Sequence, residues 1–219
     1  MALGRASFVY EAVWGRVFAK AYDVAFVLAE KRGLSAIRRD LIGRAAGRVL
    51  ELGAGTGRNI EHYPESITEL VLSEPDAQMI ARLRRRVALS PGKMSVLGMN
   101  AEEISVRDAS VDTVVSTLVL CSVRDPVRTL AEVARILRPG GTFLFAEHVR
   151  SDSVSSARWQ DKMSRTWGWC ACGCQCNRDT LSTLDGSPLR VEAMWKDRLH
   201  WVGPLIRPLV VGVATNIAR

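Results

Sequence analysis

Residues 49–59 read Val49-Leu50-Glu51-Leu52-Gly53-Ala54-Gly55-Thr56-Gly57-Arg58-Asn59, a short apolar run that leads into three alternating glycines. The apolar run predicts a buried strand. The glycines predict a tight turn whose backbone can approach a ligand without a Cβ in the way. We expect a helix over residues 58–63, whose first N–H groups would face the same ligand. A strand, a glycine turn and a helix in this order are typical of sites for nucleotide-like ligands.

The charges around this turn discriminate between such ligands. A dinucleotide fingerprint, Gly-x-Gly-x-x-Gly, requires glycine where Arg58 stands, which disfavours an NAD-dependent redox enzyme. Glu51 precedes the turn, and its negative charge repels a pyrophosphate but suits an ammonium or a sulfonium group. Glu74 ends the next predicted strand, where sheets of this kind place a carboxylate for ribose hydroxyls. The two acids together favour S-adenosylmethionine as the ligand.

Short apolar strands alternate with helices from residue 48 to residue 148. The predicted strands are 49–52, 70–73, 95–97, 111–117 and 142–146, and helices are predicted over 76–87 and 126–137. This alternation predicts an α/β fold with a doubly wound, mostly parallel sheet and helices on both faces. Ligands of such sheets bind at the carboxyl ends of the strands. Residues 151–188 show no regular pattern, and the last two strands are predicted over 190–195 and 209–218.

The N-terminal segment carries apolar residues at near-helical spacing over residues 8–33, and a short helix is predicted over 34–43. The pattern leaves open whether the first helix packs on the domain, covers the active site as a lid or lies on a membrane surface. We therefore expect a helical extension over residues 1–47 and a single globular unit over residues 48–219.

The composition restricts the binding partners and the cellular compartment that we expect for this protein. The chain has 219 residues and a net charge of +7, which favours anionic partners such as phospholipid surfaces. It has neither an RNP-like aromatic motif nor zinc-finger spacing, so no nucleic-acid partner is expected. No apolar run reaches the ~18 residues of a membrane span. We expect a cytoplasmic protein, with peripheral membrane association as the alternative; the oligomeric state is not readable from the sequence.

Five motifs together resemble the class I S-adenosylmethionine-dependent methyltransferases, in their small-molecule type 11 group. The motifs are 49–59, 73–76 with Met79, 100–102, 111–123 and 137–149, and the resemblance covers about residues 18–218. Residues 116–123, 137–149 and 173–180 are similar to the membrane-associated thiol S-methyltransferases, a group of methyltransferase-like proteins, and to their bacterial relatives.

The resemblance implies a Rossmann-like fold with a seven-stranded sheet. It also implies S-adenosyl-L-methionine as cofactor, S-adenosyl-L-homocysteine as product, and a small, apolar molecule as methyl acceptor. A thiol is the favoured acceptor. N- or O-methylation of a phospholipid, a quinone or a natural product stays open. A protein module that binds the cofactor without catalysing methyl transfer also stays open as an alternative.

Individual cofactor contacts follow from the same resemblance. Gly53, Ala54 and Gly55 would approach the methionine part of the cofactor, and the carbonyl of Thr117 or Leu118 would reach its ammonium together with Glu51. Glu74 would hold the ribose. Adenine would lie near Met79, Asn100 and Ala101, although the family more often has Asp where Asn100 stands. The remaining cofactor-binding positions are Thr56, Asn59, Pro75 and Glu102.

Two residues are candidates for catalysis. His148 follows the fifth predicted strand, and its imidazole titrates near neutral pH, so it could deprotonate or orient a thiol, phenol or ammonium substrate. A structural hydrogen bond is the alternative role for His148. Glu147 precedes it, but neighbouring strand residues face opposite sides and need not act together. Tyr22 matches the lid tyrosine of the family's N-terminal helix.

Four of the five cysteines fall within residues 170–176, at every second position. An extended strand would place all four on one face. Zinc sites usually use Cys-x-x-Cys spacing instead, so no metal is expected. A soft metal, a redox role and contact with the substrate stay as alternatives. Cys121 is expected to line the pocket or to pack after the fourth strand, with no role as a covalent nucleophile.

Overall fold

The computed structural model describes residues 26–171 and 173–217. Tyr22 and most of the helix expected over residues 8–33 lie outside this part of the chain. The proposed lid and the boundary at residue 47 therefore stay predictions. The described end of that segment is helical from residue 26, and a kink at Gly33, where φ is +128°, separates it from helix α2 (Ser35–Ile42).

Seven strands of the described residues form one sheet in the order β3-β2-β1-β4-β5-β7-β6. Their bounds are Arg48–Leu52 (β1), Glu69–Ser73 (β2), Met94–Leu97 (β3), Val111–Thr117 (β4), Leu137–His148 (β5), Leu189–Arg198 (β6) and Pro208–Asn216 (β7). The first five strands pair in parallel, whereas β7 runs antiparallel to both β5 and β6. The predicted doubly wound, mostly parallel sheet is confirmed. Strand order reverses beside β1, between β1 and β4, where ligands of such sheets bind.

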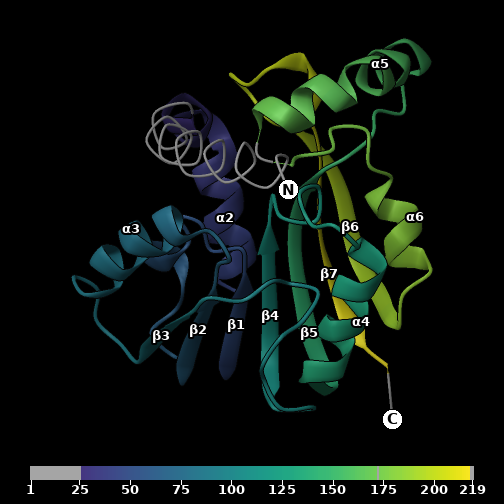
Figure 1. Ribbon diagram of the computed structural model, residues 1–219. Helices are drawn as coiled ribbons and strands as arrows, with labels where there is room; N and C mark the ends of the chain where they lie inside the picture. The colour runs from purple at the N-terminus through teal and green to yellow at the C-terminus, as the bar shows by residue number, and fades with distance from the viewer. Residues whose placement is uncertain (1–25, 172, 218–219) are drawn as a thin grey trace, which may run out of the picture.

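Helices cover both faces of this sheet (Figure 1). Their bounds are Ala77–Val87 (α3), Pro126–Ile136 (α4), Val154–Cys170 (α5) and Thr180–Asp185 (α6), beside α2. Asp76 starts α3 and Asp125 starts α4, because each carboxylate accepts backbone N–H groups of the first turn. In Figure 1, α5 lies above the end of the sheet to which the arrow of β4 points. This is the end where the site residues gather.

The side chains of each strand alternate between two apolar layers. Leu50 and Phe143 pack in the layer that contains residues of α4 and α6. Val49 and Leu144, their sequence neighbours, pack in the layer that contains residues of α2 and α3. Strands covered on both faces by apolar layers read as near-continuous apolar runs, which is why the sequence revealed them. The α2 segment belongs to the second of these layers, since Leu41 is fully buried there.

Two sequence-based expectations about helices were wrong. Residues 58–63 form only a 3₁₀ turn at Ile60–His62, because Gly57 has φ of +83° and Pro64 follows shortly after. The glycine turn therefore has no α-helix N-terminus behind it. Residues 151–188, expected to be irregular, contain α5 and α6. The apolar stripe of α5 is weak, with only Ala157 and Gln160 buried, so periodicity did not reveal it.

The cysteine cluster is not a strand either. Cys170 ends α5 and is exposed, while Cys174 and Cys176 lie buried in the turn that follows. No helix among the described residues combines the length and apolar character needed to span a bilayer.

Candidate functional site

The glycine turn after β1 uses a backbone conformation that favours glycine. Gly53, Gly55 and Gly57 all have positive φ, at +52°, +56° and +83°. A Cβ on Gly53 would lie 2.8 Å from the side chain of Val119, so the turn packs against the loop after β4. A Cβ on Gly55 would meet no heavy atom closer than 4.0 Å, so the backbone there is open to a ligand. Thr56, in contrast, is buried.

Glu51 lies at the end of β1 with its carboxylate fully buried among polar partners. Its Oε1 accepts a hydrogen bond from Nδ2 of Asn59 at 2.9 Å, and its Oε2 accepts one from the hydroxyl of Tyr63 at 2.7 Å. Arg38 of α2 donates to Oδ1 of Asn59 and pairs with Glu30 at 3.1 Å. Burial raises the pKa of Glu51 to about 7, although Tyr63, Arg38 and Asn59 oppose that rise. A cationic group placed beside this carboxylate would favour its charged form.

Glu74 follows β2 and faces the glycine turn. Its two oxygens accept hydrogen bonds from the N–H of Gly55 at 2.8 Å and of Asp76 at 2.9 Å. Burial raises the pKa of Glu74, and these two N–H donors counteract the shift. A carboxylate has about four acceptor positions. Glu74 therefore has further acceptor positions for ligand hydroxyls.

The loop after β4 is held in place by Glu147 of β5. The carboxylate accepts hydrogen bonds from the hydroxyl of Ser116 at 2.7 Å and from the N–H groups of Val119 and Leu120 at 3.1 Å. Leu118 has φ of +60°, an uncommon conformation for a leucine, and donates its N–H to the carbonyl of Ala146 at 2.9 Å. The turn after β4 is therefore fixed over the edge of the sheet.

Thr117, at the end of β4, joins this loop to the Glu51 network. Its Oγ1 lies 3.1 Å from Nδ2 of Asn59, the same nitrogen that donates to Glu51. The ends of β1, β2 and β4 thus meet around the glycine turn, as the sequence predicted. Asn59, named there only as one of the cofactor positions, is the residue that links them.

The remaining predicted cofactor positions differ in their exposure. Met79 and Ala101 are buried, whereas Pro75 and Asn100 are exposed. Glu102 accepts hydrogen bonds from the N–H groups of Arg124 at 2.6 Å and Asp125 at 3.3 Å, so its carboxylate holds the segment that leads into α4.

His148 ends β5 and lies beside two cysteines. Its Nε2 is 3.0 Å from Sγ of Cys174, and Cys121 Sγ lies in the same group, with all three ligand atoms within 4.8 Å of one another. Nε1 of Trp167 donates to Cys174 Sγ at 3.3 Å. The hydrogen bond from Cys121, with those from His148 and Trp167, lowers the pKa of the Cys174 thiol to about 4 against the effect of burial. The same contact raises the pKa of Cys121.

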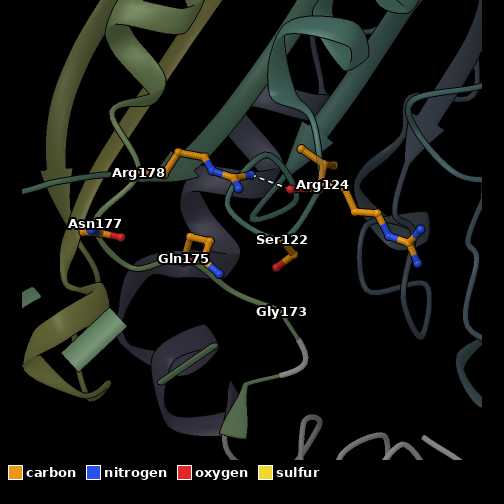
Figure 2. A pocket seen from close by; sticks show the side chains of 7 residues that line it. Ser122, Arg124, Gly173, Gln175, Asn177 and Arg178 are labelled. Carbon is orange, nitrogen blue, oxygen red and sulfur yellow. Dashed lines mark hydrogen bonds between the residues drawn. The ribbon is translucent and has the colours of Figure 1, made fainter. Parts of the chain in front are cut away.

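A pocket of about 440 Å³ adjoins these residues (Figure 2). It lies between the loop at residues 122–124 and the segment at residues 173–178. Arg178 joins the two walls, since its Nη1 donates to the carbonyls of Leu120 and Val123, each at 2.6 Å. Ser122, which lines the pocket, has its Oγ 3.4 Å from Sγ of Cys121. The pocket therefore lies next to Cys121 and is lined by both sequence neighbours of Cys174, Gly173 and Gln175.

Sequence reasoning did not find Arg38, Tyr63 or Trp167 as part of this site. Arg38 lies in a helix rich in arginine, and only its burial among Glu30 and Asn59 distinguishes it from Arg39. Glu147 was noted only as the neighbour of His148. The two neighbours have different partners, because Glu147 contacts the backbone of the β4 loop and His148 contacts Cys174.

Comparison with known proteins gives the class. A family model described as a methyltransferase domain matches residues 50–145, the segment from β1 to β5. Solved methyltransferase structures share the fold. One from Thermotoga maritima superimposes with a TM-score of 0.70 at 21% identity, covering 93% of this chain and 98% of that one. The N-methyltransferase NodS of Bradyrhizobium japonicum, bound to S-adenosyl-L-homocysteine, gives 0.64 at 16% identity, covering 87% of this chain and 88% of that one.

The fold and the family match define a class I methyltransferase, an enzyme whose cofactor is S-adenosyl-L-methionine. Curated relatives identify the family within this class. The thiol S-methyltransferase TMT1B of Homo sapiens is 36% identical over 188 residues, 81% of this chain and 76% of the relative. TMT1A of Homo sapiens is 34% identical over 175 residues, 77% of this chain and 70% of the relative. The chain belongs to the family of these thiol S-methyltransferases.

Proposed function

We propose that this enzyme transfers the methyl group of S-adenosyl-L-methionine to the sulfur of a small, apolar thiol. The observation that carries the proposal is the identity of 34–36% with proteins named thiol S-methyltransferases, over 77–84% of this chain. The surroundings of His148 support it. Leu205 and Ile206 form an apolar cluster there with Cys121 and Cys174, which suits an uncharged acceptor.

In this proposal the ends of β1 and β2 hold the cofactor. Glu51 receives the ammonium group, with a carbonyl of Thr117 or Leu118, while the backbone of Gly53, Ala54 and Gly55 lies along the methionine chain. Glu74 accepts from the ribose hydroxyls. Met79, Asn100 and Ala101 adjoin the adenine. Thr56, Asn59, Pro75 and Glu102 complete the lining; Asn59 acts by holding Glu51, and Glu102 by holding the segment before α4.

Methyl transfer is an in-line displacement in which the enzyme aligns a nucleophile with the methyl group and excludes water. The sulfonium leaving group needs no acid, but a thiol must lose its proton before it attacks. His148, at the end of β5, is the group that would deprotonate or orient the acceptor. Tyr22 lies in the N-terminal segment that precedes α2. In this proposal that segment would act as a lid that closes the site, and it would supply any contact with a membrane surface.

N-methylation is the second candidate function. It is favoured by one relative, the phosphatidylethanolamine N-methyltransferase of Cereibacter sphaeroides, which is 32% identical over 136 residues, 58% of this chain and 65% of the relative. A phospholipid acceptor would also agree with the net charge of +7.

The deciding experiment offers the enzyme sets of acceptors that share one carbon skeleton and differ only in an SH, OH or NH₂ group. S-Adenosyl-L-homocysteine release and the methylated product are followed by mass spectrometry. We expect methylation of the thiol member of each set. Methylation of only the amines or alcohols would refute the thiol assignment. Cofactor binding with no product on any set would instead indicate a binding module without turnover.

A further inference from the structure

Three side chains with the donor atoms that zinc prefers lie together beyond β4 and β5. Sγ of Cys121, Nε2 of His148 and Sγ of Cys174 are within 4.8 Å of one another, and all three residues are buried. They come from three separate segments, namely the loop after β4, the last residue of β5 and the turn after α5. We propose that they form a binding site for Zn²⁺ with two thiolate sulfurs and one imidazole nitrogen.

The spacing of the three atoms suits a tetrahedral ion after a small adjustment. Zinc binds sulfur at about 2.3 Å and imidazole nitrogen at about 2.0–2.1 Å, so tetrahedral ligand atoms lie roughly 3.5–3.8 Å apart. The 3.0 Å between His148 Nε2 and Cys174 Sγ has to widen by about half an ångström. Rotation about the side-chain bonds of Cys174 supplies a movement of this size.

The segments that carry the ligands are already fixed to one another. The N–H of Gln175 donates to the carbonyl of Cys121 at 2.8 Å, which ties the turn after α5 to the loop after β4. Trp167 donates to Cys174 Sγ at 3.3 Å, a contact of the kind that orients metal ligands from outside the coordination sphere. Because the ligands are held in place without a metal, binding requires little ordering of the chain.

The other described cysteines lack this arrangement. Cys176 is buried but points its Sγ at the carbonyl of Gln160, 3.6 Å away, and Cys170 is exposed at the end of α5. Cys170 and Cys176 are therefore not ligands, and Cys172 lies outside the described residues. Only Cys174 of the described ones contributes, and its partners come from elsewhere in the sequence.

Within the described residues, three protein ligands leave a fourth coordination position, the pattern of catalytic rather than structural zinc. The pocket in Figure 2 is lined by Ser122, whose Oγ lies 3.4 Å from Cys121 Sγ, and by Gly173 and Gln175, the two sequence neighbours of Cys174. Resting on the proposed thiol methylation, we assign the fourth position to the sulfur of the acceptor. In this assignment His148 acts as a ligand, and the metal rather than a protein base favours the loss of the thiol proton.

The resulting transfer has two steps, loss of the thiol proton and displacement at the methyl carbon. The acceptor thiol releases its proton to water when its sulfur binds the ion. A sulfur lone pair then forms the new bond to the methyl carbon, and the carbon–sulfonium bond breaks with its electron pair going to S-adenosyl-L-homocysteine. The thioether product is neutral and binds zinc more weakly than a thiolate does, so it dissociates. The ion stays Zn²⁺ throughout.

The test measures metal binding directly. The full chain is purified without chelators for zinc analysis, then stripped of metal and titrated with Co²⁺, whose thiolate complexes show an intense charge-transfer band. We expect about one zinc per chain and a saturable cobalt spectrum in the wild type. Cys121→Ser and Cys174→Ser should each lose the charge-transfer intensity, and His148→Gln should weaken cobalt binding at least tenfold. Cys176→Ser and Cys170→Ser are the matched buried and exposed controls and should retain the wild-type spectrum.

Several results would overturn the site. They are a wild type that binds neither ion, a control variant that loses the spectrum as fully as Cys174→Ser, or a Cys121–Cys174 disulfide in freshly purified metal-free protein. Should the ligand variants fail to fold, X-ray absorption on the zinc-loaded wild type decides the matter. Two sulfur neighbours and one nitrogen support the site, and a shell of oxygen and nitrogen alone refutes it.

Thiol turnover by stripped and zinc-loaded enzyme separates this inference from the proposed function. Thiol methylation at full rate by protein shown to be metal-free would refute the zinc role and leave the thiol assignment intact. Zinc held by these three residues, with methylation of only amines or alcohols, would keep the site and refute the thiol assignment.

Discussion

Tyr63 donates its phenolic hydrogen to the buried carboxylate of Glu51 at 2.7 Å, across the glycine turn that separates them in the sequence. Asn59 donates to the other oxygen of the same carboxylate. These two bonds keep Glu51 in one orientation, and burial still raises its pKa to about 7. Without cofactor, the Glu51 carboxylate that would receive an ammonium group is therefore only about half ionised at neutral pH.

Cofactor affinity should consequently depend on pH. Glu51 is protonated below pH 7 in the free enzyme and must lose that proton to pair with an ammonium group. We expect the affinity for S-adenosyl-L-methionine to fall by up to about tenfold per pH unit as pH decreases below 7. Calorimetric titrations between pH 5.5 and 7 would measure this. Glu51→Gln should bind more weakly at pH 7 and lose most of the slope; an unchanged slope would remove Glu51 from the ammonium site.

Arg38 should matter far more than its neighbour Arg39. Arg38 is buried and bridges Glu30 and Asn59, and its removal leaves a partly buried acid and a buried amide oxygen without their donor. We expect Arg38→Ala to lower the free energy of unfolding by about 3 kcal/mol. Arg39 is exposed on the same helix, and Arg39→Ala should change the free energy of unfolding by less than about 0.5 kcal/mol. Urea denaturation of both variants checks this, and equal effects would contradict the bridge.

Two glycines of the turn should respond differently to alanine. Both have positive φ, which costs an alanine roughly 1 kcal/mol. Gly53→Ala adds a contact of 2.8 Å with Val119, whereas Gly55→Ala meets nothing closer than 4.0 Å. We expect Gly53→Ala to lower the melting temperature more. Gly55→Ala should act mainly on cofactor affinity, since its new methyl group points into the open side of the turn. The reverse order of thermal stabilities would argue against this packing.

Glu147→Gln tests whether Glu147 organises the loop after β4. Both oxygens of Glu147 accept from N–H groups, so an amide NH₂ in either place would face a donor. We expect a loss of about 2–3 kcal/mol in unfolding free energy together with weaker cofactor binding. Glu103→Gln, at an exposed position, provides the control. Wild-type stability in Glu147→Gln would mean that these bonds contribute little to the loop.

His148→Ala should lower turnover and spare cofactor binding. The imidazole contacts Cys174 and takes no part in the hydrogen bonds from Asn59 and Tyr63 that hold Glu51, so its loss leaves those bonds intact. Steady-state rates with the best thiol, alongside cofactor titrations, would show the two effects separately. Unchanged turnover with an ionisable acceptor would exclude His148 from the reaction.

The sequence by itself determined the parallel sheet and the position of the cofactor loop. The strands and helices between residues 48 and 148 can be recognised one by one. Each strand is covered by an apolar layer on both faces, and its own sequence is therefore an apolar run. Glu51 and Glu74 could be found for the same reason, since each directly follows a recognisable strand core. The helix α5 could not be predicted, because its surface is largely exposed and leaves little periodic pattern.

Only the tertiary structure decided which polar side chains meet. Arg38 reaches Asn59 across 21 residues, and His148 reaches Cys174 across 26, through contacts that depend on how α2 and the turn after α5 dock on the sheet. The sequence drew attention to four alternating cysteines, yet the structure joins one of them to Cys121 and His148 instead. Spacing along the chain records the local period of an element, whereas strand order and docking bring distant side chains together.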